Sequence, residues 1–484
     1  MIFNSVQFAI FLPIVFALYW LLRQRLLWQN MLVLAASYVF YGWWDWRFLL
    51  LIAFTSGCSY LSGLLIKPTN GGGNLGQAYI NKFALWGNIV VNLAILALFK
   101  YYDFFASELA QLLHLQSDPL LLHLVLPVGI SFYTFQALSY SIDIYKGKLE
   151  PTRDVVAFFA YIAFFPQLVA GPIERATNLL PQFLHHRHFN HAQAVDGARQ
   201  ILWGLFKKMV VADNCAVYVD EVFSYGGGPS THLLAAVLFS FQIYGDFAGY
   251  SDIAIGTAKL FGIRLMQNFR TPYFSRDIAE FWRRWHISLT TWFRDYVYIP
   301  LGGSRVAKWK VARNTFVIFL ISGLWHGANW TFITWGFYHA CLFLPLILLN
   351  HNRKHTDVVA FGRWLPSLKE SGQILLTFAL VTIGWIIFRC TGIPSTTAFL
   401  TDIFSPNALA ATWKFFVVPD FPVARAGIII MIIVEWIQRD KEHGLQDIDN
   451  HIRSKNLRCG LYIISIVLIF FFRGDYATFI YFQF

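Results

Sequence analysis

The run from Thr315 to Leu349 contains no Lys, Arg, Asp or Glu, and it limits what this chain can fold into. As a single helix it would measure roughly 52 Å, well beyond a bilayer hydrocarbon core of about 30 Å. The run must therefore tilt strongly, bend or break. We expect the break at Ser322, Gly323, Gly327 and Ala328, because glycine lowers the cost of leaving a helix and serine can satisfy a freed backbone group.

His326 lies inside this cluster of small residues. Measured from Asn314 at the polar margin of the run, it would lie about 18 Å along a helix axis, which is close to the middle of a bilayer. An ionisable side chain at that depth is a candidate for function. The alternative is structural, because a neutral imidazole can also bond to a neighbouring helix.

The composition is typical of polytopic membrane proteins. Hydrophobic residues make up 57% of the chain and charged residues only 13%, which lies outside the range of soluble proteins. Apolar segments of spanning length alternate with short polar loops. We therefore predict an all-α membrane protein, one domain over residues 1–484, with roughly ten to twelve transmembrane helices.

The net charge of +11 does not indicate nucleic-acid binding, because the basic residues are spread through short loops. Positive loops on the cytoplasmic side of a membrane explain them better. Residues from Val6 to Leu22 predict a first span with no cleavage pattern, and Arg23 and Arg25 follow it directly. This order predicts a cytoplasmic first loop and an N-terminus on the opposite side.

Neither a metal site nor a disulfide framework is predicted. The five cysteines lie mostly in apolar segments and show no CxxC spacing. The tract HHRHFNH, which begins at His185, lacks an acidic or cysteine companion and lies in a polar connector. These features favour a solvated basic loop over a metal site.

Several local patterns predict interruptions of the helical chain. The segment YGWWDWR from Tyr41 indicates a tight turn between two spans, and KPTNGGGNLG from Lys67 a flexible loop. Pro127 and Gly129 predict a kinked or broken helix. The segment AFFAYIAFFPQLVAGP from Ala157 is too short and too interrupted for a comfortable span, so we expect it to be buried or re-entrant.

Two carboxylates lie in the apolar segment QIYGDFAGYSDIAIG, which also contains Gln242. Asp246 and Asp252 are costly there unless they pair or face water. They could bond to a basic side chain of another span as scaffolding, or line a polar cavity used by substrate. Gly245 and Gly249 would allow a close approach of a neighbouring helix.

The segment 264–313 is strongly basic, with ten Lys or Arg against three Asp or Glu. Within it, apolar residues recur at intervals of three and four, which predicts an amphipathic helix at the cytoplasmic interface. His286 lies beside this stripe and could point toward the helix bundle, or be an ordinary interfacial histidine. The stripe consists of Trp282, Trp285, Leu289, Trp292 and Tyr296.

Familiar catalytic signatures of soluble enzymes are missing, including GxSxG, Walker A and HExxH. The candidate catalytic residues are therefore His286 and His326. A neutral imidazole can take the proton of a hydroxyl while that oxygen attacks an activated carbonyl, as acyl transfer requires. Basic residues at the cytoplasmic mouth would attract the phosphates of an acyl carrier such as coenzyme A, although membrane topology alone also explains them.

Five blocks of the sequence resemble the membrane-bound O-acyltransferase family, especially its bacterial branch that acts in polysaccharide O-acetylation. Together with a similar C-terminal FIYFQF they span more than half the chain, and as a set they are highly specific. The blocks are LPVGISFYTFQALSYSIDIYKG from Leu126, FFPQLVAGPIER from Phe164, YGDFAGYSDIAIG from Tyr244, NFRTPYFSRDIAEFWRRWHISLTTWFRDYVYIPLGGSR from Asn268 and SGLWHGANWTFITWGFYH from Ser322.

The resemblance implies a ring of tilted helices with re-entrant segments around a central tunnel, and a catalytic core near residues 120–350. It implies that His326 is the catalytic residue and that His286 occupies the second catalytic position. Further candidates for lining the tunnel or contacting substrate are Asp246, Asp252, Trp325, Asn329, Trp285 and Gln242. Candidates for binding the donor phosphates are Arg283, Arg284 and Arg294.

The resemblance also implies the reaction and its partners. We expect a multi-pass protein of the bacterial inner membrane that moves acetyl from cytoplasmic acetyl-CoA toward an exported polysaccharide, through a periplasmic partner of the SGNH-hydrolase type. No tightly bound cofactor is expected. The alternatives are D-alanyl transfer to teichoic acid, a transporter or lipid flippase with polar residues at the midplane, and a catalytically silent scaffold.

Overall fold

The computed structural model describes residues 1–67, 75–115, 118–169, 171–408, 422–475, 477 and 479–480, and the regular secondary structure there is helical. This confirms the predicted all-α class. Most of the predicted loop after Lys67 and the last four residues of the FIYFQF ending lie outside the described residues.

Six of the described helices are long and apolar enough to cross a membrane, which confirms a polytopic membrane protein. They are α3 (Arg47–Leu65), α4 (Leu75–Lys100), α12 (Pro229–Leu260), α16 (Trp330–Leu348), α17 (Leu368–Arg389) and α22 (Lys455–Phe472). Two shorter apolar stretches, Val6–Leu21 and Val155–Leu168, add to them. Within the described residues, the apolar helices α2 (Leu26–Gly42) and α20 (Pro422–Ile437) are slightly shorter, and the total of ten to twelve spans stays a prediction.

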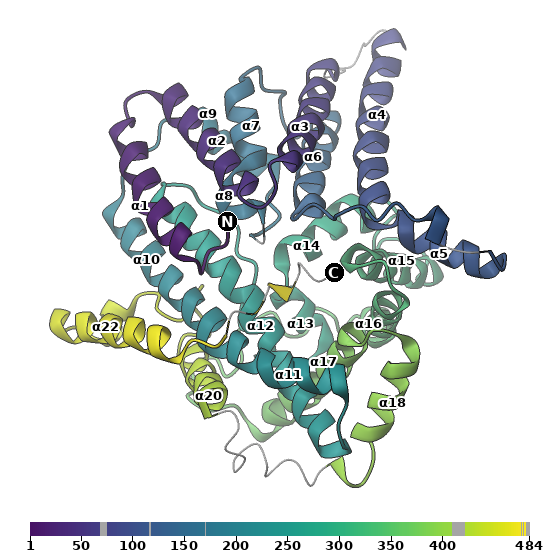
Figure 1. Cartoon of the computed structure of the whole chain (residues 1–484), viewed down its shortest axis with the longest axis vertical. Coiled ribbons are helices and arrows are strands. Elements are labelled where there is room, and N and C mark those ends of the chain that lie inside the picture. The colour runs from purple at the N-terminus through teal and green to yellow at the C-terminus, as the bar shows by residue number, and fades with distance from the viewer. Residues whose placement is uncertain are drawn as a thin grey trace. The chain divides into compact units, whose positions relative to one another are not determined.

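The chain forms two compact units, and the first consists of Met1–Ala198 and Ala254–Met266. Besides α3 and α4, its helices are α1 (Val6–Leu21), α2 (Leu26–Gly42), α5 (Tyr102–Leu112), η1 (Asp118–Leu120), α6 (Ile130–Tyr145), α7 (Val155–Ala163), α8 (Phe165–Leu168), α9 (Ala176–Leu184) and the beginning of α10 (His191–Leu205). Figure 1 shows α2, α7, α8 and α9 as neighbours within this unit.

The predicted interruptions occur in this first unit. Helix α2 ends at Gly42 and α3 begins at Arg47, and the turn between them is held by an Asp45–Arg47 ion pair of 2.6 Å. Gly129 has a φ of +74°, a conformation that disfavours other residues, and α6 begins directly after it. The segment predicted to be buried or re-entrant folds as α7 and α8, and its side chains are almost completely enclosed.

The second unit consists of Arg199–Ile253 and Gln267–Phe484. It contains α16, α17, α22 and most of α12. Its further elements, in chain order, are η2 (Phe206–Ala212), α11 (Asp213–Tyr225), η3 (Pro272–Phe274), α13 (Ile278–Arg284), α14 (Ile287–Phe293), η4 (Arg294–Tyr298), α15 (Lys308–His326), α18 (Ile393–Ile403), α20 (Pro422–Ile437) and α21 (Ile448–His451). Both η2 and η4 are π-helical turns, which are rare and often occur at functional sites.

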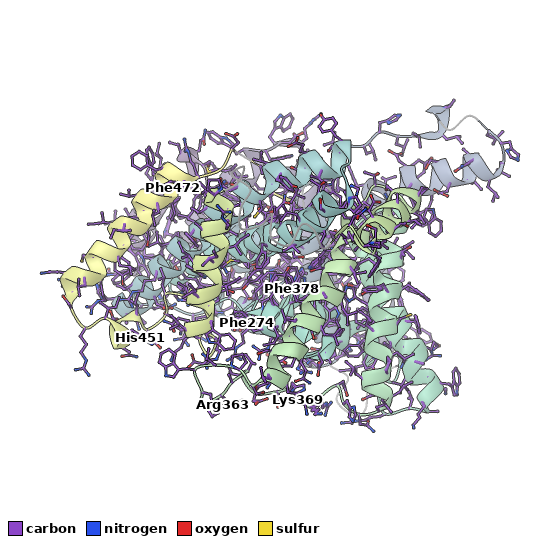
Figure 2. The ribbon with its side chains drawn as sticks, turned by 90° about the horizontal axis from the view of Figure 1, so that it is seen from below. Phe274, Arg363, Lys369, Phe378, His451 and Phe472 are labelled. Carbon is purple, nitrogen blue, oxygen red and sulfur yellow. The ribbon has the colours of Figure 1, made fainter. Side chains whose placement is uncertain are left out.

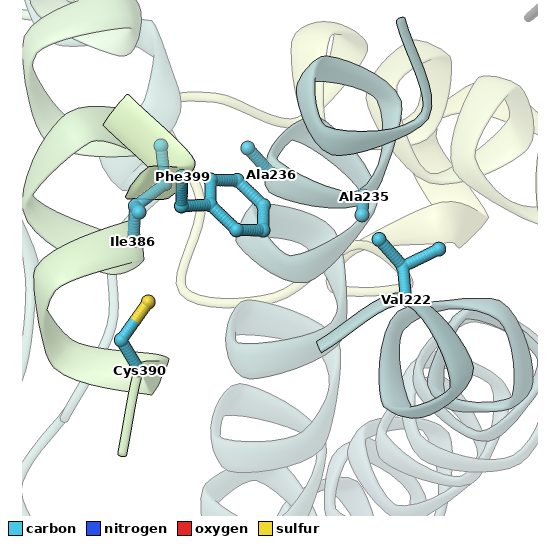
Figure 3. Packing of buried hydrophobic residues seen from close by; sticks show 6 residues of the cluster. All are labelled: Val222, Ala235, Ala236, Ile386, Cys390 and Phe399. Carbon is cyan, nitrogen blue, oxygen red and sulfur yellow. The ribbon is translucent and has the colours of Figure 1, made fainter. Parts of the chain in front are cut away.

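Small and aromatic side chains set the packing of this unit. A Cβ atom at Gly249 would lie 2.8 Å from the carbonyl oxygen of Gly204, so glycine permits the predicted close approach of helices at α12. Figure 3 shows α11, α12, α17 and α18 meeting in one apolar cluster. Figure 2 shows Phe274 and Phe378, and the Phe378 ring on α17 lies 5.1 Å from the ring of Tyr273 in η3.

Candidate active site

The uncharged run breaks where its small residues predict. Helix α15 ends at His326, Gly327 is extended, and Asn329 caps α16 by accepting a 2.9 Å hydrogen bond from the backbone N–H of Thr331. Figure 1 shows the two helices side by side, and the chain reverses between them. A Cβ atom at Gly323 would collide with the carbonyl oxygen of Phe332, so this reversal depends on a residue without a side chain.

Aromatic rings surround His326, which is only 5% exposed. The centre of its imidazole lies 4.8 Å from the ring of Trp325, 5.1 Å from that of Trp335 and 5.2 Å from that of Phe388. These contacts come from α15, α16 and α17. The end of one helix and the aromatic faces of two others therefore fix the position of this imidazole.

His286 lies at a break that the apolar stripe did not reveal. The prediction of one amphipathic helix through residues 282–296 is wrong, because α13 ends at Arg284, His286 adopts a left-handed φ of +43°, and α14 begins at Ile287. Backbone hydrogen bonds stabilise this turn, from the N–H of Ile287 to the carbonyl of Asn268 and from the N–H of Arg270 to the carbonyl of Arg284. The tryptophans of the stripe are buried in the unit rather than laid on its surface.

The side chain of His286 is held by polar and aromatic groups. Its Nδ1 lies 3.0 Å from Oδ1 of Asn268, and its ring centre lies 4.6 Å from the ring of Phe247 and 5.9 Å from that of Trp325. The residue is 1% exposed, and this burial lowers its pKa from the usual 6.5 to about 3. The imidazole is therefore neutral at physiological pH and carries a lone pair.

Both histidines contact Trp325, so three of the residues singled out in the sequence belong to one cluster. Trp285 lies beside it, with its ring 5.0 Å from that of Phe269, whose own ring lies 6.3 Å from that of His286. The amide of Asn329 caps α16 and donates to the carbonyl of Thr391, and its predicted contact with substrate stays a prediction.

The carboxylates of α12 are held in ion pairs. Asp246 lies 2.6 Å from Nζ of Lys208, and Asp252 lies 2.5 Å from Nζ of Lys207. These ion pairs agree with the scaffolding alternative. Asp252 also lines a small cavity of about 20 Å³ beside Lys207 and Glu435, so the predicted contact of these carboxylates with substrate stays a prediction. Gln242 is buried on the same helix, and its predicted contact with substrate stays a prediction.

The lysine partners were missed in the sequence, although a signal was present. Lys207 and Lys208 stand next to each other in the otherwise apolar run FKKMVVA, and buried lysines normally require acidic partners. Asn268 was also missed, since nothing in its local pattern distinguishes it from a loop asparagine.

A cavity of about 310 Å³ opens beside this cluster and is lined by Arg283, Arg294 and Arg353. Its apolar wall includes Trp282, Phe293, Phe319 and Phe343, and Ser322 also lines it. This volume is at the lower end of ligand pockets in proteins. The third predicted phosphate ligand, Arg284, does not line the cavity, because it is buried in an ion pair of 2.8 Å with Glu280.

Two tryptophans connect the cavity to the histidine cluster. Trp282 lines the cavity, its ring lies 5.6 Å from that of Trp335, and Trp335 contacts His326. Ser322 lies one helical turn before His326 on α15. Trp282 and Trp335 therefore stand between the cavity and the imidazole on this path, and a tunnel that crosses the membrane stays a prediction.

The part of the chain that the structure describes contains no group of three or more His, Cys, Asp or Glu side chains that could hold a metal ion. The polar groups nearest the histidines are instead amides, hydroxyls and indoles. The cluster therefore offers proton transfer by imidazoles next to an apolar cavity with a cationic rim.

Residues 152–370 match the family described as MBOAT, membrane-bound O-acyltransferase family. A protein from Pseudomonas aeruginosa named "Probable alginate O-acetylase AlgI" is 42% identical over 80% of this chain and 72% of its own length. A peptidoglycan O-acetyltransferase from Helicobacter pylori is 31% identical over 100% of this chain and 98% of its own length. A teichoic acid D-alanyltransferase from Bacillus subtilis is 29% identical over 54% of this chain and 68% of its own length.

Proposed function

Because the chain belongs to the membrane-bound O-acyltransferase family, we propose that it moves acetyl groups from cytoplasmic acetyl-CoA toward an exported polysaccharide. The enzyme class, an O-acyltransferase, follows from the family itself. The choice of acetyl is supported by relatives that acetylate alginate and peptidoglycan and that match 80% and 100% of this chain.

The two imidazoles supply the proton transfers of this reaction. His326 takes the proton of the attacking hydroxyl as its oxygen forms a bond to the thioester carbonyl, the carbon–sulfur bond then breaks, and the departing thiolate takes up the proton. His286 assists or positions the reacting groups from the other side of Trp325. A neutral imidazole suits the first step, because only the neutral form can accept a proton.

The cavity beside the cluster supports a coenzyme A donor. Arg294 and Arg283 provide positive charge at its rim for phosphates, and its aromatic wall suits an uncharged thioester arm. In this proposal acetyl-CoA is a substrate, and no tightly bound cofactor is required. The other predicted phosphate ligand, Arg284, acts in the scaffold through Glu280.

The acceptor side of the proposal involves a second protein. The relatives are named for alginate and peptidoglycan, and an exported acceptor of this kind supports a location in the bacterial inner membrane. Arg23 and Arg25 after the first apolar helix support an N-terminus in the periplasm. We expect the acetyl group to pass to a periplasmic acetyltransferase of the SGNH type, which would hold the glycan.

The observation that carries the proposal is the contact of both histidine rings with Trp325 inside the family-matched region. The test uses purified protein in proteoliposomes supplied with radiolabelled acetyl-CoA and a hydroxyl acceptor. We expect acetyl transfer that falls by about 10³-fold in His326→Gln. Full turnover by a folded His326→Gln protein would overturn the assignment.

The same assay separates the alternatives. Turnover with a D-alanyl carrier protein and none with acetyl-CoA would favour D-alanyl transfer to teichoic acid, in line with the match to the Bacillus subtilis protein. Flux of a substrate across the vesicle membrane without any covalent acyl turnover would favour a transporter or flippase. A neighbouring gene for an SGNH-type protein would support the polysaccharide acceptor.

A further inference from the structure

Asn268 makes a network of hydrogen bonds that converges on the His286 ring. Its side-chain Oδ1 lies 3.0 Å from Nδ1 of His286 and accepts a 2.9 Å hydrogen bond from the hydroxyl of Ser288. Its Nδ2 donates to the hydroxyl of Ser251 on α12 at 2.9 Å. Asn268 and His286 are 0% and 1% exposed, so no bulk water competes for these bonds.

The orientation of the Asn268 amide follows from its neighbours. The backbone N–H of Ser288 points at Oδ1 from 3.4 Å, and a backbone N–H can only donate. The atom it faces must therefore be the amide oxygen. An amide oxygen can only accept, so Nδ1 of His286 must carry the proton in the neutral ring.

The backbone makes this arrangement rigid. The Asn268 carbonyl accepts the N–H of Ile287, and the His286 carbonyl accepts the N–H of Thr290 in the first turn of α14. His286 itself is held at a φ of +43°, a conformation that a non-glycine residue adopts only when its surroundings enforce it. The two residues are thus fixed relative to each other by main-chain bonds as well as by the side-chain bond.

We propose that Asn268 is a positioning residue that keeps His286 in the Nδ1–H tautomer, so that the lone pair is carried by Nε2. This inference rests on the proposed function only where it concerns turnover. Which ring nitrogen is protonated decides which one can accept a proton from a substrate, and a ring in the wrong tautomer loses that ability.

The experiment reads the tautomer directly. Protein labelled with ¹⁵N at Nδ1 of histidine is reconstituted in lipid, and solid-state ¹⁵N spectra of wild type and His286→Gln are subtracted to isolate residue 286. We expect a protonated Nδ1 in the wild type. An unprotonated Nδ1 would overturn the proposal without any variant of Asn268.

Three variants then connect the tautomer to activity. Asn268→Leu removes the acceptor, and we expect a mixture of tautomers and a fall in kcat of about 10- to 100-fold with little change in KM for the donor. Asn268→Asp retains the acceptor, so the Nδ1–H tautomer should persist, and the carboxylate should raise the pKa of His286 and shift the pH profile of kcat upward. Ser251→Ala is the matched control, which disturbs the network without touching the ring.

Asn268→Leu protein that retains both the protonated Nδ1 and wild-type kcat would overturn the proposal. Failure of the proposed function looks different. If His286→Gln keeps full turnover while the wild-type spectrum shows the Nδ1–H tautomer, Asn268 still positions the ring, and the role of His286 in acyl transfer is the part that is wrong.

Discussion

The second unit contains two buried polar regions that the sequence marks in the same way, as ionisable residues within apolar segments, but they are neutralised differently. In the lysine–carboxylate region, Lys208 lies 2.7 Å from Asp213 and 2.6 Å from Asp246, so each charge has an opposite charge beside it. In the histidine region, His286 contacts an amide and His326 contacts aromatic rings. The first region is thus held by ion pairs, whereas the imidazoles of the second lie among uncharged groups, and a neutral ring there can accept a proton.

Breaking an ion pair should have the largest effect on stability. Lys208→Met leaves Asp213 and Asp246 buried without their cation, and we expect a loss of at least about 3–5 kcal/mol in the free energy of unfolding. The measurement is equilibrium unfolding in mixed detergent micelles followed by circular dichroism. Lys310→Met, at an exposed position on α15, is the control and should change stability by less than about 0.5 kcal/mol.

A neutral replacement of the whole group sharpens this test. The triple variant Lys208→Met, Asp213→Asn, Asp246→Asn removes every charge together and should recover much of the loss. If the triple variant is as unstable as Lys208→Met, these side chains contribute to stability through more than the neutralisation of one another's charge.

The opposite pattern is expected in the histidine region. His286→Gln can still donate a hydrogen bond to Asn268, so the fold should hold, while acetyl turnover should fall by about 10²-fold because the ring's proton acceptor is gone. Turnover in proteoliposomes and unfolding in micelles are compared for the same preparation. If His286→Gln loses stability as well as activity, the role of His286 is structural.

Glu174, in the first unit, is a buried carboxylate whose hydrogen-bond donors are uncharged. It accepts hydrogen bonds from the Asn178 amide at 2.7 Å and from the backbone N–H of Met266, and burial raises its pKa from 4.5 to about 7. The folded state therefore keeps a proton that the unfolded state releases, so stability should decline as pH rises from about 4.5 to about 7.

Glu174→Gln should flatten that decline and add about 3 kcal/mol at pH 8. Melting temperatures across this pH range provide the measurement. Equal pH dependence in the variant and the wild type would show that another group titrates.

The smallest expected effect concerns the cationic rim of the cavity. Arg294→Gln should raise KM for acetyl-CoA by about 3- to 10-fold and leave kcat within about twofold, because a partly exposed arginine acts mainly by attracting phosphates. The difference should shrink at high salt. Arg305→Gln, an exposed arginine that does not line the cavity, is the matched control and should leave KM unchanged.

Much of the fold class could be read from local sequence, and so could part of the site. The apolar composition specifies a membrane protein, and the small residues from Ser322 to Ala328 specify the break after α15, because helix breaking depends on residues within one or two turns. His326 was identified from its place in that cluster, and its importance was reinforced by the resemblance to the family.

Other features depend on residues that are far apart in the chain. Asp252 meets Lys207, and His286 contacts Trp325, across separations that no periodicity encodes. The left-handed turn at His286 could not be predicted from the local pattern for the same reason, because the carbonyl of Asn268 stabilises it from another segment.

The sequence by itself determined that the chain is helical, spans a membrane and carries two histidines suited to proton transfer. Only the tertiary structure decided that the α12 carboxylates pair with Lys207 and Lys208 and that both imidazoles meet at Trp325. The reason is physical: hydropathy and backbone breaks are properties of neighbouring residues, whereas the partner of a buried polar group is chosen when distant segments pack and exclude water.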